Sequence, residues 1–461
     1  MTETDMTPVD EGGVDEGGVD EGEVAIAAAP KRLGANFYKL FTGSVISNVG
    51  DGVSLIAYPW LASAVTRNPI LIALVFVAQR LPWLVFTLPA GVITDRVDRR
   101  RAMVTMDVLR GLLTLGVALA VLGQQDSLPG PDDVDSVTGT RTGIYLLVVL
   151  ATLLLGMAEV LRDNSAQTIL PAIVHTSQLE KANGRMWSAE SVANQFIGPP
   201  LGSLLLAVAF ALPFFLDAAS FFVAAALVFL IPGSFRADGH ETRERRPWRT
   251  ELAEGFRWLW GHSLLRPMAI ILGITNGAMM ITTSTFVLFA QEVLDVGPLL
   301  FTVIGFGGAI GAVIGGAVAD RVTRRLGAGT CLSLTLGGTA VVSALIGLSS
   351  HWAPVLVLFT IMTLLGILWN VITVSLRQAI IPSHLLGRVN SVYRFFAWGM
   401  MPIGALLGGT TVAVVSSVAN RRIALRSAFL LDGVIYLCLF IVGRSKLTTA
   451  KLEAARTAVP A

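Results

Sequence analysis

The chain has 461 residues, of which 53% are hydrophobic and only 14% are charged. A soluble domain carries about 25% charged residues, and a single soluble core stops growing at about 250–300 residues, so a water-soluble fold could not bury this much apolar surface. The composition therefore predicts an integral membrane protein. The two cysteines, Cys331 and Cys438, lie inside apolar stretches and predict neither a disulfide framework nor a metal site.

The N-terminal segment is acidic and repetitive. Its first 23 residues hold nine acids and no Lys or Arg, and Val-Asp-Glu-Gly repeats between Val9 and Gly22. Such a segment has too few apolar side chains to fold, and its charge is the opposite of that of a secretory signal. We expect residues 1–36 to form a disordered cytoplasmic tail. The net charge of +2 for the whole chain therefore hides a basic remainder.

Twelve apolar runs are long enough to cross a bilayer, because a spanning helix needs about 20 mostly apolar residues. The runs are Lys39–Leu61, Ile70–Ile93, Ala102–Leu122, Gly143–Glu159, Trp187–Leu206, Pro213–Ile231, Met268–Phe289, Leu299–Val318, Ala328–Leu348, Pro354–Thr373, Val389–Val414 and Ala428–Val442. A long polar interruption divides them into six-helix bundles at 37–233 and 264–443, with a linker at 234–263 and a cytoplasmic tail at 444–461. Within the linker, Trp248–Trp260 is expected to form an amphipathic helix on the membrane surface.

The orientation follows from the basic residues. Most Lys and Arg residues fall in the connections that share a side with the two termini. Because cytoplasmic loops are rich in Lys and Arg, we expect a multi-pass protein of the cell membrane with both termini in the cytoplasm. A group at the outer end of the last hairpin (Arg421, Arg422 and Arg426) breaks the pattern.

Ionisable residues inside the spans are costly and therefore informative. Asp51 and Arg80 lie at similar depths in spans one and two, and we predict a buried ion pair between them. Ser44, Asn48 and Asp51 share one helix face, which we expect to point into a central cavity. Asp51 is either a proton carrier, if substrate or a conformational change draws Arg80 away, or a structural partner of Arg80.

Other polar residues inside the spans give weaker indications. Asp107 and Arg110 are one turn apart and are expected to satisfy each other. Asp217 and Asp432 lie near the outer ends of their spans, where we expect water to reach them. From midspan position we predict that the substrate cavity contains Asn48, Asn276, Trp369, Asn370 and Phe395.

A repeat connects the two sets of spans. Gly91-Val-Ile-Thr-Asp95-Arg96-Val-Asp-Arg99-Arg100 recurs 225 residues later as Gly316-Ala-Val-Ala-Asp320-Arg321-Val-Thr-Arg324-Arg325. Three further matches follow in the same order: Gln167–Pro171 with Gln378–Pro382, Gly184–Ser188 with Gly387–Ser391, and Leu216-Asp217 with Leu431-Asp432. The order of the matches predicts a duplicated six-helix unit whose copies run parallel.

With this repeated motif, the sequence resembles the major facilitator superfamily from about Phe37 to Gly443. The repeated Gly-x-x-x-Asp-Arg-x-x-Arg-Arg loop is the signature of that superfamily. The segments Ser47–Gly52 and Arg80–Pro82 look like the branch that contains the enterobactin exporter and macrolide efflux proteins. The resemblance implies an all-α membrane protein with twelve transmembrane helices in two parallel six-helix repeats. It also implies alternating access to a small-molecule site, with no cofactor, metal or nucleic acid.

The two signature loops imply a cytoplasmic gate. In the superfamily, an acid at the end of a span pairs with an arginine of the other half and closes the cytoplasmic side. The predicted contacts are Asp95 with Arg388, Asp320 with Arg185, and Glu159 with Arg96 or Arg99. The predicted gate residues are Gly91, Asp95, Arg96, Arg99, Arg100, Glu159, Arg185, Gly316, Asp320, Arg321, Arg324, Arg325 and Arg388. The two glycines are expected to permit close packing.

Span five is similar to the antiporter motif of the family. The segment Gly198-Pro199-Pro200-Leu201-Gly202-Ser203 follows Gly-Pro-x-x-Gly-Gly, but Ser203 replaces the last glycine and Asn194 replaces the leading one. The resemblance implies export, with Gly198, Pro199 and Gly202 allowing helices to approach and bend. A packing kink without that meaning is the alternative.

The sequence lacks the features of an ATP-driven pump and of an enzyme. The chain has no Gly-Lys pair and so no phosphate-binding loop of an ATP-driven pump, and its five histidines lie scattered in loops, so no enzyme site is expected. The sequence predicts a monomeric secondary transporter that exports an amphiphilic drug, antibiotic or siderophore by proton antiport. A proton-coupled importer and a non-transporting membrane sensor on the same scaffold are the alternatives.

Overall fold

The apolar runs fold into helices, and the computed structural model places no strand among the residues it describes, which are 33–130, 137–236 and 248–457. The helices before residue 237 are α1 (Ala35–Val65), α2 (Pro69–Val85), α3 (Thr87–Arg96), α4 (Arg99–Leu122), α5 (Thr142–Ile173), α6 (Leu179–Val192), α7 (Gly198–Val208) and α8 (Leu212–Phe229). Those after it are α9 (Trp248–Gly261), α10 (Leu265–Glu292), α11 (Pro298–Leu326), α12 (Ala328–Leu348), α13 (Trp352–Ile380), α14 (Ser383–Ser416), α15 (Arg421–Lys446) and α16 (Thr449–Thr457). The predicted tail falls on residues 1–32, outside the described residues, and on the start of α1.

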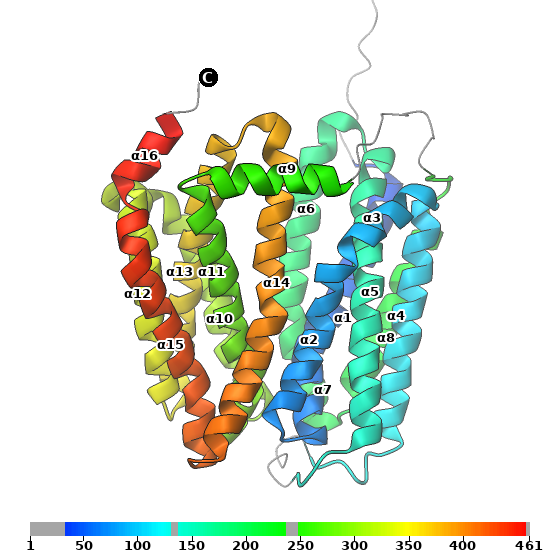
Figure 1. The fold of residues 1–461 in the computed structure, drawn as a ribbon. Coiled ribbons are helices and arrows are strands. Elements are labelled where there is room, and N and C mark those ends of the chain that lie inside the picture. The colour runs from blue at the N-terminus through cyan, green and yellow to red at the C-terminus, as the bar shows by residue number, and fades with distance from the viewer. Residues whose placement is uncertain (1–32, 131–136, 237–247, 458–461) are drawn as a thin grey trace, which may run out of the picture. The chain divides into compact units, whose positions relative to one another are not determined.

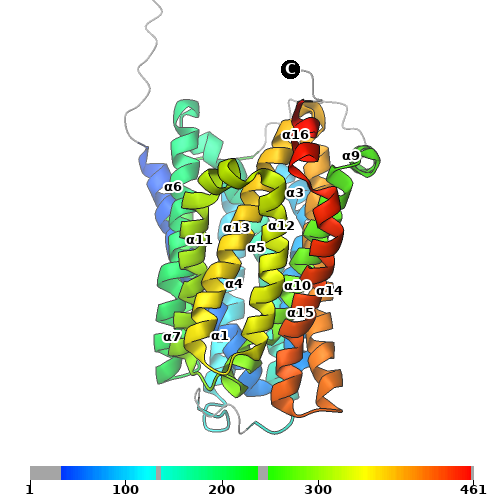
Figure 2. The same cartoon turned by 90° about the vertical axis from the view of Figure 1, so that its left-hand side faces the viewer.

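The long helices correspond to twelve membrane spans. Eleven helical stretches of the described residues are long and apolar enough to cross a membrane, and one of them combines α6 and α7. The twelfth is the predicted second span, which is divided at Phe86 into α2 and α3. The predicted helix count is therefore confirmed. Figures 1 and 2 show these helices side by side, with α9 lying across their ends.

The spans have two ends, which we name by the chain. The tail side is the side where α1 begins and α15 ends, at the top of Figure 1. The far side is the opposite one, where α1 ends and α15 begins. The α3–α4 connection, α9 and α16 all lie on the tail side.

The packing of the helices repeats as the sequence does. In the first half α1 packs on α7, α2 on α5, and α4 on α8. In the second half the equivalent helices make the same pairs, α10 on α14, α11 on α13, and α12 on α15. The halves meet where α2 packs along α14 and α7 along α11. This pattern is that of two parallel copies of one six-helix unit.

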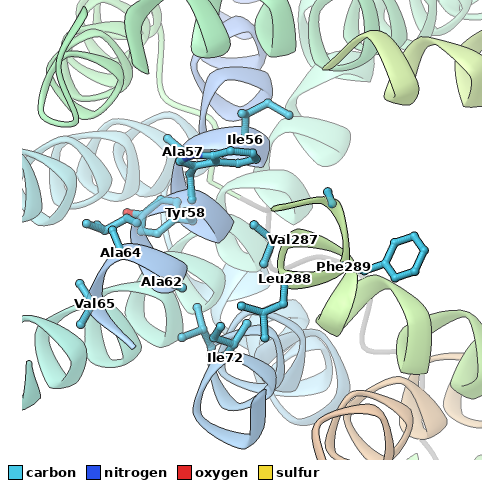
Figure 3. Close-up of a cluster of buried hydrophobic side chains, with 14 of the residues drawn as sticks. Ile56, Ala57, Tyr58, Ala62, Ala64, Val65, Ile72, Val287, Leu288 and Phe289 are labelled. Atoms are coloured by element: carbon cyan, nitrogen blue, oxygen red, sulfur yellow. The ribbon is translucent and has the colours of Figure 1, made fainter. Parts of the chain in front are cut away.

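The two halves share an apolar core on the far side. Figure 3 shows side chains of α1 and α2, among them Tyr58 and Ile72, close to Val287 and Leu288 of α10. Trp60 is fully buried and packs edge-to-face on Phe301 of α11, with ring centroids 5.1 Å apart. Separating the halves here would expose these packed side chains and lose their close contacts.

On the tail side the halves have separate cores. One apolar cluster joins α1, α4, α5, α6 and α8 around Phe37, and another joins α9 to α16 around Trp369 and Tyr393. Neither cluster contains residues of both halves. The two halves therefore share an apolar core at the far side only.

The linker helix α9 forms where an amphipathic helix was expected. It packs against α14 and α10, and Glu254 accepts a hydrogen bond from Arg388 Nη1 at 2.7 Å. Phe256 and Trp260 stack on each other at 5.1 Å and are both partly exposed. Both rings also stack near Phe396 of α14, with centroid distances of 6.5 and 6.4 Å. One face of α9 is thus docked on the second half, and its contact with a membrane surface stays a prediction.

Candidate functional site

A cavity of about 1170 Å³ lies within the first half. It extends from Tyr58 and Asp217 to Asn183 and Trp187 near the tail side. The charged residues that line it are Asp51, Arg80, Arg110, Glu159, Arg162, Asp163, Glu190 and Asp217. Among the described lining residues there are thus five carboxylates and three guanidinium groups. Such a concentration of charge inside a membrane protein marks a functional site.

Asp51 pairs with Arg110 rather than with Arg80. Arg110 Nη2 lies 2.5 Å from Asp51 Oδ1, and only 4% of the Arg110 side chain is exposed. Arg80 lines the same cavity without making this ion pair. The prediction was wrong because it paired consecutive spans, whereas α2 packs along α5 and α14 and leaves α1 to α7 and α8.

Two arginines share a buried carboxylate beside this ion pair. Asp107 Oδ1 lies 3.7 Å from Arg110 Nη1 and 3.5 Å from Arg162 Nε. The Arg162 Nη2 group donates a hydrogen bond to Ser44 at 3.0 Å. The predicted contact between Asp107 and Arg110 is confirmed. Because buried charges are costly unless they are paired, this network fixes α1, α4 and α5 relative to one another.

The polar face predicted for α1 lines the cavity. Ser44, Asn48 and Asp51 are all among its lining residues. The Asn48 amide donates to the Ser44 carbonyl at 2.7 Å, and its Oδ1 accepts from Asn194 at 2.9 Å. Asn194, which replaces the leading glycine of the antiporter pattern, therefore joins the fifth span to the polar face of α1.

The repeat-related acids are both buried. Asp217 is 2% exposed and Asp432 is 1% exposed. Ser54 donates a hydrogen bond to Asp217 Oδ2 at 2.5 Å. A Cβ atom at Gly50 would collide with Ser220 and Asp217, so the glycine makes room for the acid against α1. Both acids were expected near the outer ends of their spans, whereas each is almost fully buried and lines one of the two cavities.

A second cavity, of about 660 Å³, lies within the second half and is mostly apolar. Asn276, Trp369 and Asn370 line it. They were predicted to contact the substrate, and that contact stays a prediction. Phe395 lines neither of the two cavities and is 59% exposed. Its midspan position therefore did not place it in either cavity.

The antiporter-like motif shapes the contact between the halves. A π-helical turn at Ala193–Ile197 precedes Gly198, because the prolines that follow have no N–H group for the regular helical bonds. A Cβ atom at Gly198 would lie 2.5 Å from Gly52 Cα of α1. The Ser203 hydroxyl contacts Thr302 and donates to the Pro298 carbonyl at 3.0 Å. The expected close approach is present, and the departure at Ser203 provides a bond to the other half.

The predicted gate contact of Asp320 is not made in this structure. Asp320 instead forms an ion pair with Arg324 on its own helix, and Arg185 donates to the Tyr38 hydroxyl at 3.2 Å. A Cβ atom at Gly91 or Gly316 would meet no atom within 4 Å, so the expected close packing is absent as well. Both findings agree with the separate cores of the tail side, because the described contacts of Asp320 and Arg185 stay within their own halves.

Glu159 is too deep to meet the arginines of the signature loop. The sequence placed the end of span four at Glu159, whereas α5 continues to Ile173, about 21 Å further along a helix. Glu159 therefore lines the cavity, and Arg99 donates to the Thr168 carbonyl at 3.2 Å instead. The Asp95 side chain lies outside the described residues, so its contact with Arg388 stays a prediction.

A polar network that was not predicted from the sequence joins the halves on the far side. Arg67, between α1 and α2, lies 2.5 Å from Glu292 at the end of α10 and donates to Gln291 at 2.6 Å. Arg421 bonds Glu292 at 2.9 Å and the Arg67 carbonyl at 2.7 Å. The sequence did contain an indication of this network. Arg421 belongs to the arginines at the outer end of the last hairpin, which depart from the expected distribution of Lys and Arg.

Asp98 joins two connections on the tail side. Its carboxylate accepts hydrogen bonds from the Arg101 N–H at 2.9 Å, the Phe235 N–H at 2.7 Å and the Ser234 hydroxyl at 3.0 Å. Partial burial acts to raise the pKa of Asp98, but these hydrogen bonds outweigh it and the pKa is lowered. Asp98 thus caps α4 and ties it to the end of α8 in its ionised form.

Known proteins resemble this chain over most of its length. The multidrug efflux pump Tap of Mycobacterium tuberculosis is 27% identical over 393 residues, which cover 82% of this chain and 86% of that protein. Macrolide efflux protein A of Streptococcus pyogenes is 22% identical, covering 88% and 94% of the two chains. The enterobactin exporter EntS of Shigella boydii is 25% identical, covering 88% and 92%.

The fold has solved counterparts. The inward-facing, unoccupied structure of a bacterial homologue of the human lysosomal transporter Spinster superposes with a TM-score of 0.65 at 12% identity, covering 92% of this chain and 96% of that one. The family model of the Major Facilitator Superfamily matches residues 40–405. With its duplicated helical units and its paired cavities, the chain belongs to the Major Facilitator Superfamily.

Proposed function

We propose that this protein exports an amphiphilic small molecule, of the class of drugs, antibiotics or siderophores, in exchange for protons. The relatives named as efflux pumps and as an exporter support the direction of transport. We propose that it is a monomer in the cell membrane with both termini in the cytoplasm. The distribution of Lys and Arg supports the orientation of the termini. The tail side is then the cytoplasmic side.

The observation that carries the proposal is the asymmetry between the two ends. The halves share one apolar core and the Arg67–Glu292–Arg421 network on the far side, but have separate cores on the tail side. Such an arrangement is that of a state open to the cytoplasm. Alternating access then requires the far-side contacts to break while the signature loops close the tail side.

The first-half cavity supports the coupling to protons. With five carboxylates facing three guanidinium groups, it contains more acid than its bases can neutralise. A buried carboxylate without a full counter-charge takes up a proton more readily. We assign proton exchange to Asp51 and its neighbours, with Arg110 as the group that must release Asp51.

The decisive experiment measures the accumulation of candidate compounds in cells with and without the gene, and with and without a protonophore. Export predicts lower accumulation when the gene is present, and the difference should disappear with the protonophore. Higher accumulation with the gene would instead indicate uptake. The Asp51→Asn variant should lose proton-driven export, whereas unchanged pH dependence in this variant would leave Asp51 only a structural role.

A further inference from the structure

We infer that the second-half cavity binds the protonated amine of an amphiphilic small molecule, with Asp432 accepting from the amine and Trp369 donating to a second polar group of the same molecule. The inference deepens the proposed export and rests on it. It assigns the substrate to the second half and leaves the charged cavity of the first half to protons.

Two buried polar atoms of this cavity lack partners. Asp432 Oδ1 and Trp369 Nε1 have no hydrogen-bond partner among the described residues. Asp432 is 1% exposed and Trp369 is 8% exposed, and both line the cavity. Buried polar groups are almost always hydrogen-bonded, so an unpaired acceptor and an unpaired donor in one cavity indicate a ligand that supplies both bonds.

The rest of the lining matches an apolar molecular body. Leu272, Met279, Phe359 and Met362 contribute to the walls, and methionine and aromatic side chains adapt to ligands of varied shape. The volume of about 660 Å³ falls within the range of roughly 300–1,000 Å³ that is usual for drug-sized ligands. The cavity therefore suits an amphiphile that is larger than an ion and smaller than a peptide.

The position of the carboxylate favours a cation. Asp432 lies 11 residues after Arg421, the start of α15, or about 17 Å from the far end of the helix. No ion pair of Asp432 occurs in the part of the chain that the structure describes. Of the two arginines that line the cavity, Arg377 lies three residues from the end of α13 and has its guanidinium 4.6 Å from the Tyr393 ring. The midspan acid is thus available to a cationic ligand.

The two repeat-related acids are therefore expected to differ in function. Asp217 accepts from Ser54 and shares its cavity with three arginines. Asp432 lies in a cavity whose lining is mainly apolar. Duplication placed an acid in both halves, and the surroundings give each acid a different ligand: a proton in the first half and an organic amine in the second.

The test measures binding to the purified full-length chain in detergent, without a gradient. The probes are dansylcadaverine, a fluorescent aryl sulfonamide with a primary amine, and its N-acetyl derivative, which is neutral. We expect the amine to bind at least about tenfold more tightly than the neutral probe, because a charged hydrogen bond is lost in the latter. Asp432→Asn should abolish this preference while leaving the affinity for the neutral probe unchanged.

Further variants serve as controls for the binding measurement. Asp432→Glu retains the carboxylate and should retain the preference, and the exposed control Glu180→Gln should behave as the wild type. Trp369→Phe removes the N–H donor but keeps an aromatic ring, and should weaken both probes equally. Thermal unfolding of each variant checks that it folds.

The outcomes separate this inference from the proposed function. Equal binding of both probes by the wild type, or an amine preference that persists in folded Asp432→Asn, would overturn the inference and leave export untouched. An Asp432-dependent preference in a chain that exports nothing from cells would overturn the export proposal instead.

Discussion

The charged residues inside this protein pair with residues on helices that are distant in sequence. Asp51 of α1 is balanced by Arg110 of α4, and Asp107 is shared between Arg110 and Arg162 of α5. Each charge would be costly alone in a low-dielectric interior, and each is made tolerable by a partner. The buried network therefore has a structural role, and it lies at the site to which we assign proton exchange.

The choice of ion-pair partner can be tested through stability. Arg110→Gln should destabilise the protein strongly, by about 3–5 kcal/mol, because Asp51 loses its counter-charge and the buried Asp107 keeps only Arg162. Arg80→Gln is the matched control and should cost much less. Thermal unfolding of the purified variants in detergent measures both. Equal destabilisation by the two substitutions would restore Arg80 as the partner of Asp51.

The cap at Asp98 predicts a dependence of stability on acid. Because its pKa is lowered in the folded protein, the ionised Asp98 stabilises the fold above the ordinary pKa of 3.8. This contribution is lost as the pH falls through the lowered pKa. Asp98→Asn should therefore lower the unfolding temperature at pH 7 by a few degrees, and the difference from the wild type should shrink below pH 4. A constant difference at all pH values would contradict the hydrogen-bonded carboxylate.

At the scale of the elements, close approach of α1 and α7 depends on glycine. The π-helical turn before Gly198 and the prolines after it bend the fifth span, and this bend brings its backbone against Gly52. Small residues permit such contacts in membranes, where packing replaces the hydrophobic effect as the main attraction between helices. The antiporter-like motif is thus a packing device whatever its role in transport.

Two alanine variants separate packing from gating. Gly198→Ala should destabilise the fold by about 1–3 kcal/mol, because the added methyl group meets the α1 backbone. Gly316→Ala should fold with normal stability, since it faces open space in this state, but should slow transport if the signature loop packs closely when the tail side closes. Stability is read from thermal unfolding, and transport from efflux assays. Normal stability of Gly198→Ala would show that the helices can separate freely there.

At the scale of the whole molecule, one end is closed and the other is not. The far-side core and the Arg67–Glu292–Arg421 network hold the halves together, whereas α9 and the signature loops belong to the side with separate cores. The proposed alternating access therefore exchanges one set of contacts for the other. The exchange is possible only if neither set is much more stable than the other.

Locking the far side should stop transport. Cysteines at positions 67 and 292, in a chain whose native cysteines are replaced by serine, join the two halves when treated with a short bifunctional thiol reagent. Export should be blocked by this cross-link and should return after reductive cleavage of the reagent. A matched pair at positions 350 and 426 lies within the second half, where Arg426 donates to Ser350 at 2.7 Å, and its cross-link should have no effect. Export through a fully cross-linked 67–292 protein would disprove the far-side gate.

The sequence alone determined the spans, the duplication and the family, because bilayer thickness, helical rise and repeated motifs are local properties that a linear pattern records. It also placed Asn48 and Asp51 on one polar face, since helical periodicity fixes which residues share a face, and both line the first-half cavity. Asn276, Trp369 and Asn370 were predicted from midspan position alone, and they line the second-half cavity. The tertiary structure alone decided which charges meet. Asp51 pairs with Arg110, Glu159 lies in the middle of its span, and Arg67 pairs with Glu292 of the other half. These contacts depend on which helices are neighbours and on which end of the molecule the halves are packed together.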